Sequence, residues 1–196
     1  MILAEEIELA RRLIAGDASV RELFIETFQK KVFQYSYLSC GQREDAEEVA
    51  QETLLKVWEH FGELRQAEHV KTWVFRIARN VCLTRRRKSE FAPCEEMSIE
   101  KVPTVWQGNL ADKGYLPEDL TYQHELRRVL AKAIHGLPEK YRSVVVMRDL
   151  EEMSIEDTAG ILGVSESVVK TRLVRARGLL RKRLELEGLL SLSVGE

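Results

Sequence analysis

The sequence predicts an all-α protein of two small helical domains joined by a flexible linker. Apolar residues recur at helical spacing in almost every segment, and the alternation of β-branched residues that is typical of strands is missing. Residues 91–120 interrupt this pattern, because they hold three of the four prolines and no sustained apolar stripe. The 196 residues suffice for two domains that each bury a core, the first at 1–90 and the second at 121–187.

Four helices are expected in the first domain, and glycines mark three of their ends. Gly16, Gly41 and Gly62 each follow a segment in which apolar residues have helical spacing. Asp45 and Glu48 have the three-residue spacing of an N-terminal capping box, so the third helix is expected to begin at Asp45. The expected helices cover about residues 3–15, 18–40, 45–61 and 70–88.

The second domain is predicted to contain a helix-turn-helix. Ser154 is a suitable N-cap with Asp157 three residues later, and Gly163 provides a turn before Ser165 caps the next helix. On that helix apolar residues recur at i, i+4, i+7 and i+11, which predicts a buried stripe. The stripe consists of Val169, Leu173, Ala176 and Leu180. The expected helices cover about residues 121–135, 139–150, 155–162 and 166–187, with a tail at 188–196.

The net charge of −2 conceals two strongly basic stretches. Residues 71–88 contain seven basic side chains and no acidic one, and residues 165–183 contain seven against one glutamate. The rest of the chain is acidic. Two basic stretches in an otherwise acidic chain predict two separate contacts with a polyanion.

Each basic stretch has a helical face suited to nucleic acid. In the fourth helix this face combines an aromatic and an amide with arginines, which suits single-stranded nucleic acid, although a core role is the alternative for the tryptophan. It consists of Trp73, Arg76, Asn80 and Arg87. In the last helix the face mixes cations with groups that can contact base edges in a major groove, and a solvated basic helix is the alternative. It consists of Ser167, Lys170, Thr171, Val174 and Arg175.

The third helix has an acidic outer face that includes apolar residues. A face of this kind suits a basic protein partner, and an ordinary solvated helix surface is the alternative. The outer face is expected to hold Glu44, Glu48, Gln51, Leu55 and Trp58 or Glu59. The inner face is expected to hold Ala46, Ala50, Thr53, Val57 and Phe61.

Several classes of function lack their sequence signatures. Cys40, Cys82 and Cys94 are far apart and have no ligand spacing with a histidine, so neither a metal, a cofactor nor a disulfide is expected. The sequence has no HExxH, no Gly-rich phosphate loop and no GxSxG, so an enzyme acting on a small-molecule substrate is not expected. No secretory signal or membrane-spanning run is present, which favours a cytoplasmic protein that is not itself inserted in a membrane.

Three segments resemble the extracytoplasmic-function (ECF, group IV) sigma factors, which belong to the sigma-70 family of bacterial RNA polymerase subunits. Residues 45–58 resemble region 2.2, and residues 71–80 resemble regions 2.3 and 2.4. Residues 137–142 and 154–183 resemble region 4. The order and spacing of the segments make the resemblance specific. It implies a dissociable subunit that directs core polymerase to promoters, with domains for sigma regions 2 and 4.

The resemblance also implies three groups of site residues. Residues that dock on the β′ clamp helices of core polymerase would be Asp45, Glu48, Gln51, Glu52, Leu55 and Trp58. Residues that melt the −10 duplex, receive a flipped base or hold the non-template strand would be Leu64, Gln66, His69, Trp73, Arg76, Arg79, Asn80 and Arg87. Residues that face the −35 duplex would be Ser167, Lys170, Thr171, Arg172, Val174 and Arg175.

The implied partners are core RNA polymerase, through its β′ clamp helices and β flap, promoter DNA, and an anti-sigma factor that would hold the protein at the inner membrane face. Two other functions stay open from the residues themselves. One is an autonomous helix-turn-helix regulator of duplex DNA, although such regulators usually dimerise and the sequence offers no dimer helix. The other is a helical protein-interaction adaptor, which would not explain two basic stretches with aromatic and amide residues in register.

Overall fold

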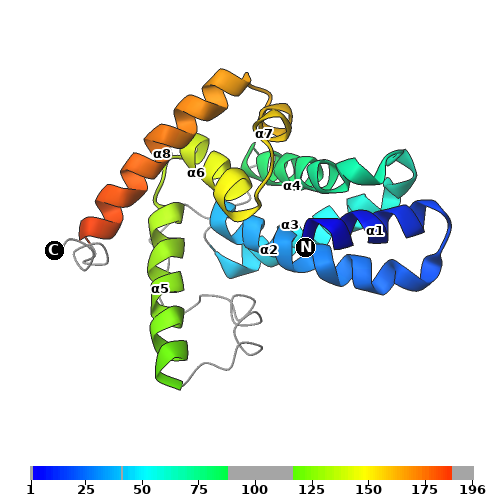
Figure 1. Cartoon of the computed structure of the whole chain (residues 1–196), viewed down its shortest axis with the longest axis horizontal. Helices are drawn as coiled ribbons and strands as arrows, with labels where there is room; N and C mark the ends of the chain where they lie inside the picture. Colours follow the sequence, from blue (N-terminus) through cyan, green and yellow to red (C-terminus); the bar gives the residue numbers. More distant parts are fainter. Residues whose placement is uncertain (1, 41, 88–116, 187–196) are drawn as a thin grey trace. The chain divides into compact units, whose positions relative to one another are not determined.

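The computed structural model describes residues 2–40, 42–87 and 117–186, which form two compact units. One unit lies within Met1–Cys94 and the other within Glu95–Glu196. Every element in these residues is helical (Figure 1), which confirms the all-α prediction. None of the described helices combines the length and apolarity that a bilayer crossing requires. The predicted tail, Cys94 and most of the predicted linker lie outside the described residues.

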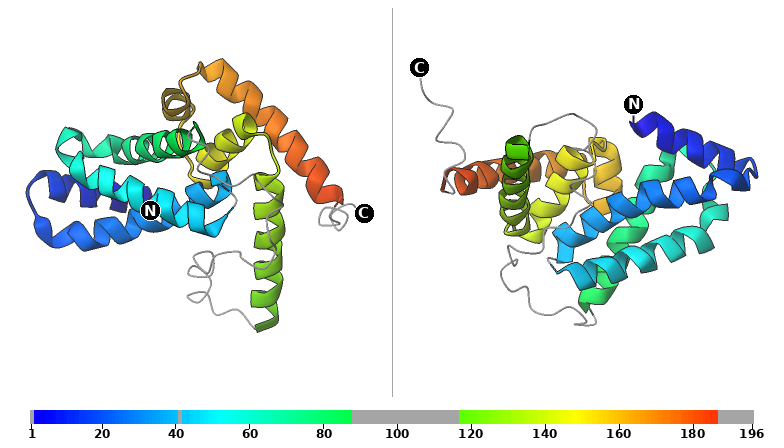
Figure 2. Two further views of the ribbon diagram at one scale, coloured as in Figure 1. Left: turned by 180° about the vertical axis from the view of Figure 1, so that it is seen from behind. Right: turned by 90° about the horizontal axis from the view of Figure 1, so that it is seen from below.

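The described residues of the first unit, 2–40 and 42–87, contain four α-helices and three 3₁₀ turns. The helices are α1 (Ile2–Ile14), α2 (Arg21–Cys40), α3 (Arg43–Glu59) and α4 (Val70–Arg87). The turns are η1 (Ala18–Val20), η2 (Phe61–Glu63) and η3 (Ala67–His69). Within this unit α2 packs along α3 and α3 packs along α4 (Figures 1 and 2). The four helices follow the predicted ones to within a few residues.

The core of the first unit is aromatic on α2 and small or β-branched on α3. Phe24 and Phe28 are fully buried with ring centroids 4.7 Å apart, and Tyr35 packs edge-on against Phe75 of α4 at 5.6 Å. On α3 the buried face is formed by Ala46, Val49, Ala50, Thr53 and Val57. Small residues on α3 let its backbone approach the bulky side chains of α2 without leaving voids. The predicted inner face of α3 is therefore confirmed, with Val49 added and with Phe61 placed in η2.

The N-terminus of α3 differs from the prediction. The helix begins at Arg43, and its N-cap is Gln42, whose side chain makes no capping hydrogen bond. Asp45 therefore lies inside the first turn and caps nothing, so the capping box was wrong. Glu44 and Asp45 in the first turn still favour the helix, because carboxylates there interact with the positive end of the helix dipole.

Residues 117–186, the described part of the second unit, contain four α-helices and one π-helical turn. They are α5 (Pro117–His135), α6 (Glu139–Val145), the π-helical turn η7 (Val146–Leu150), α7 (Ile155–Leu162) and α8 (Glu166–Leu186). Residues 117–120, which the sequence assigned to the linker, form the first turn of α5. Proline suits the first helical position because it lacks an N–H that would have no partner there.

The helix-turn-helix of α7 and α8 forms as the sequence predicts. Ser154 Oγ accepts the backbone N–H of Asp157 at 2.9 Å, and Gly163 adopts a left-handed conformation with φ of 66°. The φ value favours glycine, which has no Cβ to clash there. All four residues of the predicted stripe on α8 are buried. Thr158 is fully buried, and its hydroxyl donates to the carbonyl of Ser154 at 2.8 Å, so it packs without an unpaired polar atom.

Ser154→Ala should destabilise the second unit, because it removes the acceptor for an N–H at the start of α7. The free energy of unfolding should fall by about 1 kcal/mol, the usual value of an N-cap. Urea unfolding followed by circular dichroism measures this change. Ser143→Ala serves as the control and should cost less, because the Ser143 hydroxyl only donates to the carbonyl of Glu139 within α6 and caps no N–H. Equal losses in the two variants would contradict a capping role for Ser154.

Candidate nucleic-acid interface

The outer face of α8 is exposed where the sequence predicts contacts with DNA. Five of the six predicted residues project from one side of the helix. Successive residues turn by about 100°, so residues three, four or seven positions apart share a face. They are Ser167, Lys170, Thr171, Val174 and Arg175, all exposed. Val174 is 74% exposed, so its apolar side chain is available to a ligand. Arg172 is half-buried and lies at the edge of this face.

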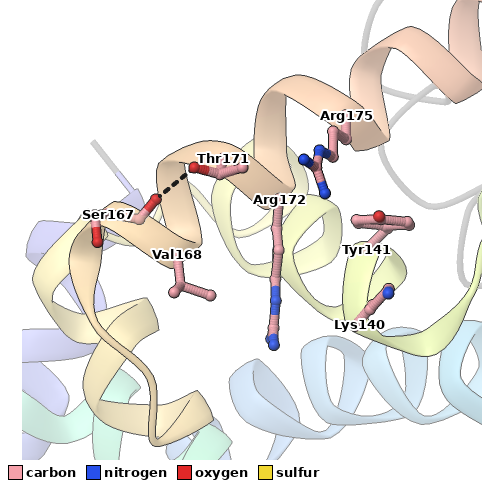
Figure 3. Close-up of a pocket in the computed structure, with 7 residues that line it drawn as sticks. All are labelled: Lys140, Tyr141, Ser167, Val168, Thr171, Arg172 and Arg175. Carbon is pink, nitrogen blue, oxygen red and sulfur yellow. Dashed lines mark hydrogen bonds between the residues drawn. The ribbon is translucent and has the colours of Figure 1, made fainter.

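A hollow of about 290 Å³ lies beside this face, between the start of α6 and α8 (Figure 3). Its lining contains three cations, three hydroxyl groups and one apolar side chain. The lining residues are Lys140, Tyr141, Ser167, Val168, Thr171, Arg172 and Arg175. The sequence prediction missed Lys140 and Tyr141, which belong to the LPEKYR segment but come from a different helix. The Arg175 guanidinium lies next to the Tyr141 phenol, and hydrogen bonding with Arg175 is the main cause that lowers the pKa of Tyr141.

Not every cation of the second basic stretch is available to a ligand. Arg177 pairs with Asp149 of the π-helical turn, with Nη2 at 2.5 Å from Oδ1. This bond raises the pKa of Arg177, whose side chain stays 60% exposed beside a carboxylate that offsets its charge. The charge of residues 165–183 therefore overstates the cationic surface that α8 presents.

In the first unit, most of the residues predicted to act at the −10 element are exposed. Gln66, His69, Arg76, Asn80 and Arg87 are exposed. The side chains of Trp73 and Arg79 are half-buried.

Leu64 differs from this group, since it is only 6% exposed and packs into the core. The turns η2 and η3 direct this loop residue inward, so its side chain is not on the surface where a flipped base was expected.

Trp73 is part of an aromatic cluster that joins α2, α3 and α4. Phe61 contacts Phe24 at 5.6 Å, Trp58 at 6.2 Å and Trp73 at 6.3 Å between ring centroids. One side of Trp73 thus packs on the unit, as the core interpretation expected. Trp73 also lines a hollow of about 280 Å³, whose other lining residues include Lys56, His60 and Asn80. Lys56 and His60 were not predicted, because they lie at the end of α3 and not on the basic helix.

The outer face of α3 presents acidic and apolar groups together. Glu48 has 61% of its side chain exposed, Leu55 is 58% exposed, and Gln51 is exposed between them. Trp58 is half-buried, because Arg21 lies over its ring at 4.0 Å and Phe61 stacks on it. Asp45 is half-buried as well, and burial together with repulsion from Glu48 raises the pKa of its carboxyl.

Arg85 joins this acidic face to the basic helix. Its guanidinium pairs with Glu48 and, at 3.0 Å, with Glu52, so one cation of the first basic stretch is held by carboxylates of α3. Burial would raise the pKa of Glu52, but hydrogen bonds from Lys56 and Arg85 outweigh it and lower that pKa. Arg85 therefore neutralises two of the residues predicted to dock on a partner.

Comparison with known proteins agrees with these two units. Residues 24–91 match the family described as Sigma-70 region 2, and residues 127–180 match Sigma-70, region 4. The ECF RNA polymerase sigma factor SigW of Bacillus subtilis (strain 168) is 30% identical over 187 residues, covering 94% of this chain and 97% of SigW. SigM of Mycobacterium tuberculosis (strain ATCC 25618 / H37Rv) is 30% identical over 179 residues, covering 91% of this chain and 84% of SigM.

Two solved structures share the fold. CnrH, in complex with the cytosolic domain of CnrY, has a TM-score of 0.64 at 21% identity and covers 92% of this chain and 97% of that chain. The sigma factor RpoE, in complex with the anti-sigma factor NepR from Bartonella quintana, has a TM-score of 0.63 at 22% identity. The match covers 85% of this chain and 98% of the RpoE chain.

A helical unit matching sigma-70 region 2, followed by a helix-turn-helix unit matching region 4, defines a protein of the sigma-70 class. With SigW 30% identical over nearly its whole length, the chain belongs to the ECF RNA polymerase sigma factors. This family is not a class of enzymes.

Arg85→Met removes the ion pair between Arg85 and Glu52. Because this pair is partly buried, the free energy of unfolding of the first unit should fall by about 1 kcal/mol at neutral pH. The loss should shrink with acidification. Since the folded pKa of Glu52 is lowered, the bond contributes fully above the ordinary value of 4.5 and is lost as pH falls through the lowered pKa. Urea unfolding between pH 7 and pH 3 measures the trend. Arg43→Met removes the exposed Arg43–Glu47 pair and should cost little at any pH. A loss for Arg85→Met that grows toward pH 3 would exclude this linkage.

Proposed function

We propose that this ECF sigma factor binds core RNA polymerase and directs it to promoters through two DNA contacts. The observation that carries the proposal is the exposed face of α8, which lies opposite a fully buried stripe on the same helix. A buried stripe fixes the helix, so its outer residues are presented in a constant arrangement, as recognition of a groove requires. The matches to sigma-70 regions 2 and 4 support assigning one contact to each unit.

For the −35 element, we propose that α8 enters the major groove of duplex DNA. Lys170 and Arg175 provide cations, Thr171 and Ser167 provide hydroxyl groups, and Val174 provides an apolar contact suited to a thymine methyl group. Arg172 lies at the edge of this face, where a phosphate is a more suitable ligand than a base edge.

For the −10 element, we propose that α4 and the preceding loop hold the melted non-template strand. Arg76, Arg79 and Arg87 provide backbone contacts, while Trp73 and Asn80 offer a base a stacking surface and hydrogen bonds. Gln66 and His69 are exposed in the loop and available to the same strand. Leu64 supports this surface from inside the core and does not itself contact a base.

For core polymerase, we propose that α3 docks on the β′ clamp helices. Glu48, Gln51 and Leu55 form the centre of this surface, where an exposed apolar side chain lies beside an amide and a carboxylate that stays 61% exposed although it pairs with Arg85. Asp45, Glu52 and Trp58 lie around them and are partly covered. The second unit is proposed to contact the β flap.

We further propose that an anti-sigma factor controls this chain in the cytoplasm. The solved relative RpoE was crystallised with the anti-sigma factor NepR, which supports a partner of this class. An anti-sigma factor anchored in the inner membrane would hold the chain at that membrane face.

Transcription in vitro tests the proposal. Purified core polymerase with this protein should produce promoter-dependent transcripts from a randomised promoter library, and core alone should not. Absence of such transcripts would refute the sigma function. Tight, sequence-specific shifting of free duplex DNA without core would favour the autonomous regulator, and binding to neither core nor DNA would favour the adaptor.

Leu55→Ala should weaken binding to core polymerase by about 1–2 kcal/mol, the range of an apolar residue at the centre of an interface. Because Leu55 is 58% exposed, the free energy of unfolding should change by less than about 0.5 kcal/mol. Fluorescence anisotropy with labelled protein measures the affinity. Leu23→Ala is the matched control, since Leu23 is 47% exposed on α2. Equal effects of the two substitutions would remove α3 from the docking surface.

Trp73→Ala should impair promoter opening while core binding stays intact, because stacking on an aromatic contributes about 1–3 kcal/mol per base. Permanganate reactivity of thymines in the −10 region measures opening. Arg76→Ala, at an exposed position of the same helix, provides a second test that does not disturb the aromatic cluster. Unchanged reactivity in both variants would contradict strand capture by α4.

A further inference from the structure

The hollow between α6 and α8 is a concentrated cationic site, and the sequence resemblance assigns no role to its α6 residues, Lys140 and Tyr141. Lys140 reaches it from α6, while Arg172 and Arg175 reach it from α8 (Figure 3). Among the described residues that line it there is no carboxylate to neutralise these cations. A site with three positive charges and several hydroxyl groups suits an oxyanion with multiple acceptors.

The hollow is continuous with the surface proposed to face DNA. Ser167, Thr171 and Arg175 line the hollow and also belong to the exposed face of α8. A duplex that receives this face in its major groove would therefore bring its sugar-phosphate backbone to the hollow. Backbone phosphates are the anions most often contacted beside a recognition helix.

Tyr141 restricts Arg175 on the side of the hollow. The Tyr141 ring lies between Lys140, whose Nζ is 5.1 Å from the ring centroid, and the guanidinium of Arg175. Arginine side chains have many rotamers, and a fixed neighbour reduces the entropy that is lost when the guanidinium binds.

We propose that this hollow binds one backbone phosphate of the −35 duplex, with Lys140 as a direct ligand and Tyr141 as the residue that positions Arg175. The inference rests on the proposed promoter binding and adds two residues from α6 to it. Lys140 acts on affinity without regard to sequence, because a phosphate is present at every position. Tyr141 acts through Arg175, for which we propose a base edge at the rim of the hollow as the ligand.

The test uses the full chain with core polymerase on a promoter selected by the wild-type protein. Single phosphates on both strands of the −35 region are replaced in turn by neutral methylphosphonates, and the affinity is measured for the wild type, Lys140→Gln and Lys182→Gln. Lys182 is the matched control, because it is an exposed lysine of α8 that does not line the hollow. If the wild type selects no promoter, the proposed function fails before this inference is tested.

For the wild type, one neutralised phosphate should weaken binding about 3- to 10-fold, and Lys140→Gln should be insensitive at that position while Lys182→Gln keeps the sensitivity. Lys140→Gln should also reduce the slope of log affinity against log salt by about 1 and weaken related promoters equally. The phosphate site is overturned if Lys140→Gln retains the full wild-type pattern of phosphate sensitivity.

Tyr141→Phe tests the positioning role, because it keeps the ring and removes the hydroxyl. It should reduce discrimination at one base pair about 3- to 10-fold, and the effect should disappear in the background of Arg175→Ala, since the two residues act as one unit. If Tyr141 had only a structural role, Tyr141→Phe would instead weaken binding to all DNA sequences equally. Unchanged base-pair discrimination in Tyr141→Phe overturns the positioning role. An undiminished effect of Tyr141→Phe in the Arg175→Ala background overturns it as well.

Discussion

Burial of the apolar stripe on α8 is the constraint on which the surface proposed to face DNA depends. Val169, Leu173, Ala176 and Leu180 are all less than a tenth exposed, and their burial fixes the rotation of α8 about its axis. Once the rotation is fixed, the opposite face must point outward, which explains why the methyl groups of Val174 are left in solvent. The capped start of α7 and the left-handed Gly163 then set how the two helices cross. The chemistry of the surface thus follows from the packing beneath it.

In the first unit the same kind of constraint acts on two neighbouring helices at once. α4 buries Val70, Val74, Phe75 and Ala78, and α3 buries a parallel row of small and β-branched residues. What remains outside is basic and aromatic on α4 but acidic and apolar on α3. Arg85 links the two surfaces, because its guanidinium satisfies carboxylates of α3 from a position on α4. The surface proposed for a protein partner and the surface proposed for a nucleic-acid strand are therefore linked by this ion pair.

Helical periodicity predicted the eight α-helices of the described residues to within a few residues, and it predicted the buried faces of α3 and α8, since both are properties of residues close together in sequence. It failed where contacts cross between elements. Asp45 has capping-box spacing, but such spacing also occurs within a first turn, and here the chain becomes helical two residues earlier. Leu64 looked like a surface residue of a loop, yet two 3₁₀ turns direct it into the core. Lys140 and Tyr141 join the hollow only because α6 packs against α8, a contact that no local pattern encodes.

The internal ion pairs also change how the charge of the chain is interpreted. Arg85 and Arg177 belong to the two basic stretches, but each is held by carboxylates of its own unit. The surface left to nucleic acid is therefore less cationic than either stretch suggests, and the whole chain has a net charge of −2. Without a large positive field, long-range attraction to DNA is weak, and affinity depends on short-range contacts at each unit. Two such modest contacts become strong only when both are made together, since linked contacts raise each other's effective concentration. A protein of this charge distribution is suited to binding DNA when a larger partner holds both of its units on the same duplex, and poorly suited to binding DNA alone.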